Sequence, residues 1–212
     1  MYFNEQELAN VDTQLNVRLA GAVTLANRMR LKREQDFLAT FFAPGVWTTE
    51  YTGVASAPTA NQMVRWSNFD TSTPIEDVTK AKTRLFLASG GTAGYADLVA
   101  VMTQDVYDVM INHPAILSRM NSGSTVTNTA LVTKAKLAEV LGVNEILIPL
   151  AIGNSGKEGL ADNHDFLVKN RFGIFARPKA PGIMTAASGY IFTWSAGTNA
   201  GFGIDVNSYT GE

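Results

Sequence analysis

A long stretch without proline, residues 4–42, limits the folds that this chain of 212 residues can adopt. Apolar residues recur along it at helical spacing, namely Leu8, Val11, Leu15, Leu19, Ala22, Val23 and Ala26, which is typical of a helix with one buried stripe. Gly21 marks the expected bend or break, because glycine costs about 1 kcal/mol relative to alanine inside a helix. If helical over residues 16–43, the segment would be roughly 40 Å long, and a small domain cannot easily cover such a helix.

Composition excludes several classes of protein. The chain has no cysteine, which rules out disulfides, thiolate nucleophiles and cysteine-ligated metal sites. Its formal net charge of −2 gives no overall basic field for holding nucleic acid. No uncharged apolar run approaches the ~18 residues of a membrane span, and the start lacks a signal-peptide pattern. We therefore expect a soluble chain with no membrane partner.

The middle of the chain alternates helical and strand patterns. Residues 46–73 show neither period and carry two tryptophans, so we expect a loop packed against a surface, its own or that of a neighbour. A capping box, Thr73 to Glu76, predicts the start of a helix that Gly90 and Gly91 end. The further predicted elements are strand 95–102, helices 103–112, 114–120 and 127–143, a buried strand 144–151, and strands 165–178 and 188–194. This order predicts an α+β chain with a central α/β unit.

Candidate catalytic and metal-binding residues have simpler explanations. His113 precedes Pro114, which favours a histidine at a helix boundary over a general base, since no motif places a nucleophile or carboxylate beside it. Asp162, His164 and Asp165 lie too close in sequence to converge readily on one metal ion, so a polar turn is favoured. The segment "AIGNSGKEG" lacks the spacing and hydroxyl of a phosphate-binding loop. We predict no catalytic, cofactor-binding or metal-binding residues, no cofactor, and no enzymatic activity.

A basic cluster lies in the long predicted helix, comprising Arg28, Arg30, Lys32 and Arg33. These side chains could meet phosphates, or they could form a solvated helix face balanced by the acidic residues four positions on, Glu34 and Asp36. The solvated face is the simpler interpretation.

Four segments, in this order and spacing, resemble the major capsid proteins of tailed bacteriophages, which have the HK-97-like fold. They are "RLKREQDFLATFFAPGVW", "RWSNFDTSTPIEDV", "DVYDVMINHPAILSRM" and "FGIFARPKAPGIMTAASGYIFTW". The resemblance implies a long spine helix and a long β layer in a peripheral domain, with a central α/β axial domain. By segment, residues 1–69 would be the part of the peripheral domain with the spine helix and loop, 70–158 the axial domain, and 159–212 the strands that return to the peripheral domain.

The resemblance also implies a function. The chain would assemble with identical subunits, as pentamers and hexamers, into an icosahedral phage head that encloses double-stranded DNA, and it would be found in the virion after assembly in the host cytoplasm. Decoration, scaffolding or portal proteins are possible partners. Arg28, Arg30, Lys32 and Arg33 would be the candidate DNA contacts, non-specific and only if the helix faces inward.

This sequence departs from the family pattern at both ends. It lacks the N-terminal arm and the extended loop that family members carry, and its final strands are short. Either it is an unusually minimal member of the family, or the 212 residues are part of a longer natural chain, which is the favoured expectation. Two alternatives remain open: the shell protein of a nanocompartment, and, less favoured, a small soluble α/β enzyme. Regular shells under the electron microscope would support a shell protein, and a persistent monomer that binds a small ligand would support the enzyme.

Overall fold

The computed structural model describes residues 17–121, 132–154, 156–157, 159, 161–180, 182 and 185–190. The chain divides into two compact units, one formed by Glu34–Ser188 and the other by Met1–Arg33 with Gly189–Glu212. The tertiary contacts described below lie within Glu34–Ser188. Within the described ranges, no helix combines the length and apolar character that crossing a bilayer requires.

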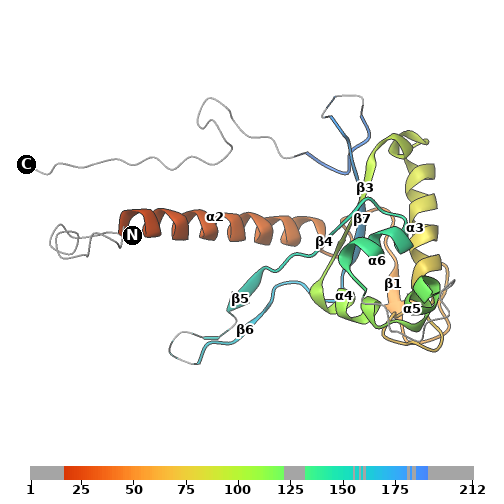
Figure 1. The fold of residues 1–212 in the computed structure, drawn as a ribbon, viewed down its shortest axis with the longest axis horizontal. Coiled ribbons are helices and arrows are strands. Elements are labelled where there is room, and N and C mark those ends of the chain that lie inside the picture. The colour runs from red at the N-terminus through yellow and green to blue at the C-terminus, as the bar shows by residue number, and fades with distance from the viewer. Residues whose placement is uncertain are drawn as a thin grey trace, which may run out of the picture. The chain divides into compact units, whose positions relative to one another are not determined.

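The elements mix helices and strands, as predicted for an α+β chain (Figure 1). The helices are α2 (Val17–Phe41), α3 (Pro74–Ala88), α4 (Gln104–Ile111), α5 (Pro114–Asn121) and α6 (Lys134–Leu141), with a short 3-10 turn, η1, at Thr92–Tyr95. The strands are β1 (Thr52–Val54), β2 (Gln62–Val64), β3 (Asp97–Met102), β4 (Glu145–Leu147), β5 (Ile152–Asn154), β6 (His164–Phe166) and β7 (Phe172–Arg177).

Helix α2 is continuous over its 25 residues, so the prediction of a break at Gly21 is wrong. Alanines on both sides of Gly21 have the highest helix propensity, and these good helix formers offset the cost of one glycine. The helix ends where Phe42 donates to the carbonyl of Leu38, just before Pro44 and a left-handed Gly45. Residues 4–16 of the predicted helix lie outside the described residues.

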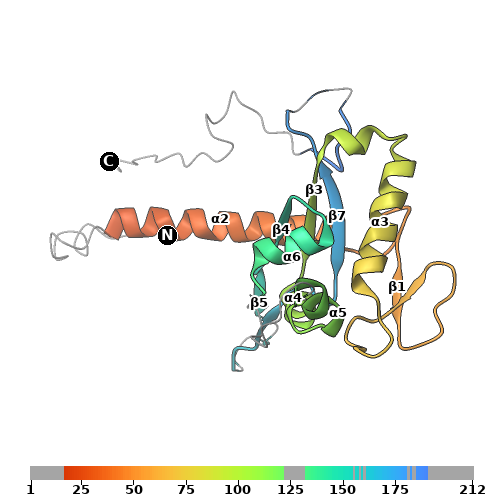
Figure 2. The ribbon, with the colours of Figure 1, turned by 45° about the vertical axis from the view of Figure 1, so that its right-hand side comes forward.

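The centre of the unit Glu34–Ser188 is a three-stranded sheet of order β4-β3-β7 (Figure 2). Strand β4 pairs parallel with β3, and β7 pairs antiparallel with it over all six residues. The sequence predicted one strand over residues 165–178, but the structure contains two, β6 and β7, in different sheets. Asn170 lies between them with φ +54°, a left-handed conformation that an uninterrupted strand cannot contain.

Strand β3 is buried on both faces and so separates two apolar clusters. Leu98, Ala100 and Met102 pack in the larger cluster with α3, α4, α5 and α6. Val99 and Val101 belong to the smaller cluster with Leu38 and Phe42 from the end of α2 and the turn that follows it. A strand covered on both faces is a nearly continuous apolar run, which is why the predicted strand 95–102 is confirmed over residues 97–102, whereas Tyr95 belongs to η1.

The predicted capping box at the start of α3 is not formed. Pro74 occupies the first turn of α3 as expected, but the Thr73 side chain makes no capping hydrogen bond at φ −128° and ψ 68°. At the other end, Gly91 donates to the carbonyl of Phe86 at 2.9 Å, which confirms that the glycine pair ends the helix.

Helix α6 is shorter than predicted, beginning at Lys134 with Thr133 as its cap. Its end at a left-handed Gly142 agrees with the sequence. The earlier part of the predicted segment, residues 127–131, lies outside the described residues.

The loop 46–73 contains two strands that the sequence did not predict. Strands β1 and β2 pair in parallel, with Thr52 opposite Gln62 and Val54 opposite Val64. Parallel strands usually need a crossover of a dozen or more residues, and the connection here is shorter. The absence of any alternating pattern in the sequence explains why the pairing was missed.

The three predicted segments, 1–69, 70–158 and 159–212, remain predictions. Strand β7 lies in the third of them and pairs with β3 of the second. The predicted strand 188–194 lies mostly outside the described residues, and its described part, Ser188 to Tyr190, is not a strand.

Candidate functional site

The four basic residues proposed to contact DNA are all exposed on α2. Arg28 and Lys32 lie one turn apart, but Arg28 and Arg30 are about 200° apart around the helix, because each residue of an α-helix turns by about 100°. The helix therefore spreads Arg28, Arg30, Lys32 and Arg33 around much of its circumference. Whether these residues contact nucleic acid remains a prediction.

Glu34, one of the acidic residues expected to balance that cluster, holds a backbone segment. Its Oε1 accepts hydrogen bonds from the backbone N–H groups of Leu150, at 2.7 Å, and Ala151, at 3.1 Å. Because Ala151 is only 2% exposed, its amide would otherwise be poorly solvated. The carboxylate thus fastens the connection between β4 and β5 to the last part of α2.

The loop tryptophans pack on their own chain. Trp47 donates from Nε1 to the carbonyl of Phe41 at 2.7 Å and meets the Phe175 ring edge-on at 5.5 Å. Trp66 meets Phe172 edge-on at 5.1 Å, and its Nε1 donates to a carboxylate oxygen of Asp77 at 3.0 Å. The sequence left open whether the loop packs on this chain or on a neighbour, and these contacts are with this chain.

A carboxylate also closes the turn after α2. Gly45 donates its backbone N–H to both oxygens of Glu50 at 2.9 Å, and Trp47 donates to one of them at 3.1 Å. These backbone donors, first that of Gly45, lower the pKa of Glu50. The Glu50 carboxylate fixes the turn, and the backbone N–H groups of Gly45 and Trp47 are already hydrogen-bonded to it.

His113 lies at the corner between α4 and α5, as predicted, and is 1% exposed. Its Nδ1 accepts from the backbone N–H of Ala115 at 3.2 Å, and its Nε2 lies 2.9 Å from Oγ of Ser72. Burial lowers the pKa of His113. These contacts are those of a residue that caps α5, which agrees with the helix-boundary interpretation.

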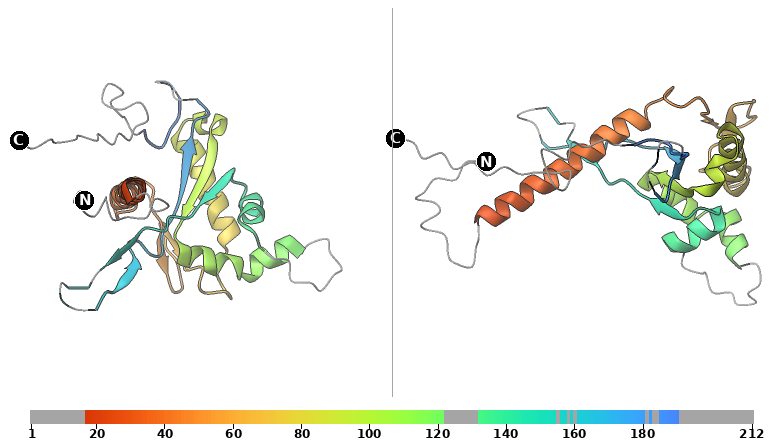
Figure 3. Two further views of the ribbon diagram at one scale, coloured as in Figure 1. Left: turned by 60° about the vertical axis from the view of Figure 1, so that its left-hand side comes forward. Right: turned by 90° about the horizontal axis from the view of Figure 1, so that it is seen from above.

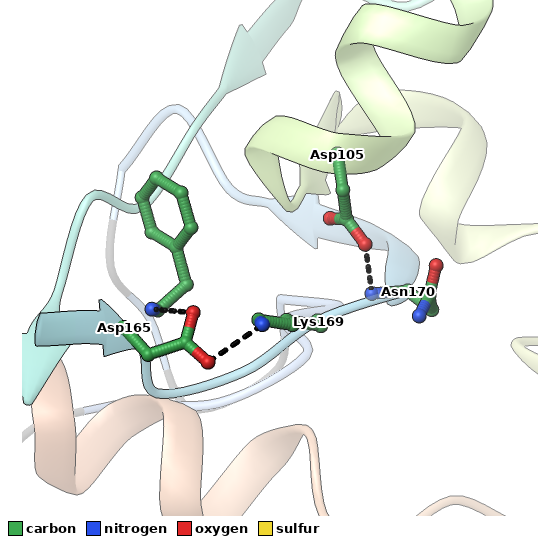
Figure 4. Close-up of polar contacts among 5 residues, drawn as sticks. Asp105, Asp165, Lys169 and Asn170 are labelled. Atoms are coloured by element: carbon green, nitrogen blue, oxygen red, sulfur yellow. Dashed lines mark hydrogen bonds and ion pairs between the residues drawn. The ribbon is translucent and has the colours of Figure 1, made fainter. Parts of the chain in front are cut away.

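The two carboxylates of the rejected metal cluster have separate partners. Asp162 accepts from the side chain of Asn154 at 2.6 Å, and Asp165 forms an ion pair with Lys169 at 2.7 Å (Figure 4). The hydrogen bond from Lys169 lowers the pKa of Asp165. Among the described residues, no group of three or more histidines and carboxylates could hold a metal ion.

The described start of the segment "AIGNSGKEG" includes β5, which is the first strand of an antiparallel hairpin. Strands β5 and β6 pair with Ile152 opposite Phe166 (Figure 3). The backbone N–H of Gly156 donates to Oδ1 of Asn154 at 2.9 Å, so an amide that a phosphate would need is engaged within the hairpin. The polar turn predicted at Asp162, His164 and Asp165 is only partly correct, because Asp162 precedes strand β6 whereas His164 and Asp165 lie within it.

The hairpin is tied to the central sheet by the segment that leads into β7. Asp105, in the first turn of α4, accepts from the backbone N–H of Asn170 at 2.6 Å (Figure 4). Thr103 and Arg171 also form two hydrogen bonds. The backbone N–H of Thr103 donates to the carbonyl of Arg171 at 3.0 Å, and the backbone N–H of Arg171 donates to the hydroxyl of Thr103 at 3.2 Å. The start of α4 therefore fixes where β6 gives way to β7.

Four exposed apolar residues lie in or near the two strands of this hairpin along the chain, and their exposure was missed from the sequence. We call them together the hairpin-base patch; they are Leu147, Leu150, Ile152 and Leu167, which are 41%, 57%, 45% and 45% exposed. The segment 144–151 was predicted as a buried strand. Within it, only Ile146 and Ala151 are buried. The apolar run "ILIPLAI" was the available signal, and composition alone cannot tell a buried run from an exposed one.

No protein-family model matches the chain, and no curated protein matches it. A solved structure does match: a phage-related protein from Bordetella bronchiseptica RB50, at 16% identity and a TM-score of 0.60, over 80% of this chain. The chain shares the fold of a phage-related protein. It spans about half the length of that protein, 49%, and at this identity the likeness concerns the fold alone.

Proposed function

We propose that this chain is a major capsid protein with the HK-97-like fold, which assembles with its own copies into the shell of a phage head. The observation that carries the proposal is the fold likeness to a phage-related protein over 80% of the chain. The sequence resemblance to phage capsid proteins points the same way independently of that likeness. Pentamers and hexamers of identical subunits are the expected assemblies, and the virion is the expected location.

The hairpin-base patch supports this proposal because a shell subunit needs surfaces that its neighbours cover. Exposed apolar patches mark interaction surfaces more often than isolated exposed residues do. Here Ile152 lies in strand β5, and Leu150 just before it, in a hairpin that has two strands in the described chain. Two-stranded sheets are marginally stable alone, and their free edges readily pair with another chain.

The experiment is assembly of the purified chain, followed by electron microscopy and light scattering. Leu150→Lys with Ile152→Lys should prevent assembly, because each lysine would place a charge in an apolar contact between copies. The matched control is Leu87→Lys, since Leu87 is 76% exposed at the end of α3. Circular dichroism should show that all variants fold.

Two results would count against the proposal. One is a wild-type chain that stays monomeric at every concentration. The other is a patch variant that forms shells as readily as the Leu87→Lys control, which would remove the hairpin-base patch from the contact.

The second part of the proposal concerns the packaged DNA. Reversing Arg28, Arg30, Lys32 and Arg33 to glutamate should reduce the nuclease-protected DNA in shells formed in infected cells, while empty shells still form. Lys134→Glu with Lys136→Glu is the control, because both lysines are exposed on α6. Equal DNA content in both variants would refute the role of the α2 cluster.

A further inference from the structure

The His113 side chain connects two segments that are distant in sequence. On one side, Nδ1 accepts from the Ala115 backbone at 3.2 Å in the first turn of α5. On the other, Nε2 lies 2.9 Å from Oγ of Ser72, which is 6% exposed in the loop before α3. The Phe69 ring of that loop meets the imidazole edge-on at 5.4 Å.

These partners fix the tautomer of the neutral ring. Because Nδ1 accepts from an amide that can only donate, the ring proton lies on Nε2 and is donated to the Ser72 hydroxyl. That hydroxyl donates in turn to the backbone carbonyl of Asn68. Every polar atom of the ring and of the serine hydroxyl is thus satisfied only when His113 is neutral.

We propose that His113 is an acid-sensitive latch, which holds residues 68–72 against the first turn of α5 when neutral and releases both when protonated. A proton on Nδ1 would face the Ala115 N–H, so two donors would meet and the capping bond would be lost. The ring would also carry a charge in a buried position without a paired carboxylate, which is costly. Leaving that position breaks the bond to Ser72 as well.

The charged groups on the surrounding elements do not favour the protonated ring. Asp77 on α3 accepts from the Trp66 indole, and Asp108 on α4 accepts from the side chain of its neighbour one turn earlier. Asp70 in the loop and Arg119 on α5 are exposed. Burial is the cause that lowers the pKa of His113, and the geometry of the two hydrogen bonds acts in the same direction.

The direction of the pH effect follows from linkage. The pKa of His113 in the closed state is below the value of about 6.5 expected once the ring is exposed. The latch is therefore fully stabilising above about pH 6.5 and weakens as pH falls toward the lowered pKa. One proton is taken up on opening, so the opening equilibrium should rise up to about tenfold per pH unit in that window and then level off.

The test is amide hydrogen exchange on the full chain from about pH 7.5 to pH 5, corrected for the intrinsic pH dependence of exchange. Residues 68–72 and the first turn of α5 should lose protection together, while the β3 to β7 pairing stays protected. His113→Asn should abolish this pH dependence, because asparagine can cap a helix but does not titrate here. His164→Gln, which changes the other histidine of the chain, should leave it intact.

Ser72→Ala gives a second, independent variant. It removes the hydroxyl but keeps the capping bond, so residues 68–72 should exchange faster at neutral pH while the start of α5 stays protected. The latch is overturned if protection of the wild-type loop does not change down to pH 5, if loop and sheet lose protection together, or if His164→Gln removes the effect. Because the contacts lie within one chain, these results do not depend on shell formation.

Discussion

Lys82 reaches from α3 to the carboxyl end of α6, and removing its charge should destabilise the unit measurably. Its Nζ donates to the carbonyl of Leu141 at 2.6 Å and to that of Gly142 at 3.2 Å. Hydrogen bonds to charged groups contribute about 1.5–3 kcal/mol, and a cation at a helix end about 0.3–1 kcal/mol. Burial lowers the pKa of Lys82, so desolvation offsets part of this gain. For Lys82→Met, which keeps the apolar stem, we expect a loss of about 1.5–3 kcal/mol.

A second substitution tests whether the ammonium group itself causes this effect. A Cβ at Gly142 would lie 2.6 Å from Nζ of Lys82, and this glycine has φ +63°. Gly142→Ala should therefore cost about 1–2 kcal/mol in backbone strain, together with the displaced lysine. In the Lys82→Met background only the backbone cost should remain. The double variant should be more stable than the sum of the two single effects predicts, by about 1.5–3 kcal/mol.

Urea unfolding, followed by tryptophan fluorescence at concentrations without assembly, measures these free energies. The control is Lys80→Met, because Lys80 is exposed on the same helix and its loss should change stability by less than about 0.5 kcal/mol. Strict additivity of the two single effects, or a Lys82→Met variant as stable as the control, would refute the reasoning.

Three further carboxylates give shorter tests. Glu34→Ala should speed amide exchange at Leu150 and Ala151, because their N–H groups lose the oxygen that accepts from them. Glu34→Gln retains an acceptor oxygen and should exchange more slowly, so equal exchange rates in the two variants would contradict this. Glu50 has a lowered pKa, so its stabilising effect is present above about pH 4.5 and is lost as pH falls; Glu50→Gln should flatten the acid side of the stability curve, and parallel curves would argue against it. Asp105→Ala should cost about 1 kcal/mol and deprotect the Asn170 amide, whereas Asp105→Asn should retain most of that protection.

Local signals in the sequence were sufficient for the central elements. Pro74 and the Gly90–Gly91 pair marked the two ends of α3, and Pro114 marked the corner that His113 caps. These residues restrict the backbone wherever they occur, so their effect does not depend on distant partners. The buried run of β3 was similarly clear, because both of its faces are apolar.

Features that depend on distant partners were not predictable. Strands β1 and β2 owe their pairing to a register between segments without alternating patterns. The sequence predicted that Glu34 pairs with Arg30 on the same helix. In the structure its carboxylate accepts hydrogen bonds from the backbone N–H groups of Leu150 and Ala151. The exposure of the hairpin-base patch was also hidden, since an apolar run does not indicate whether anything covers it.

The long antiparallel pairing of β3 has a consequence for biosynthesis. In this pairing Met102 lies opposite Phe172 and Asp97 opposite Arg177, so the paired residues are far apart in the sequence. Strand β7 must therefore be synthesised and leave the ribosome before it can pair with β3. Until then, this edge of the apolar strand β3 is unpaired in the nascent chain. Slow translation between these two points would prolong that exposure, so we expect the yield of properly folded protein to depend on chaperones that hold the emerging chain.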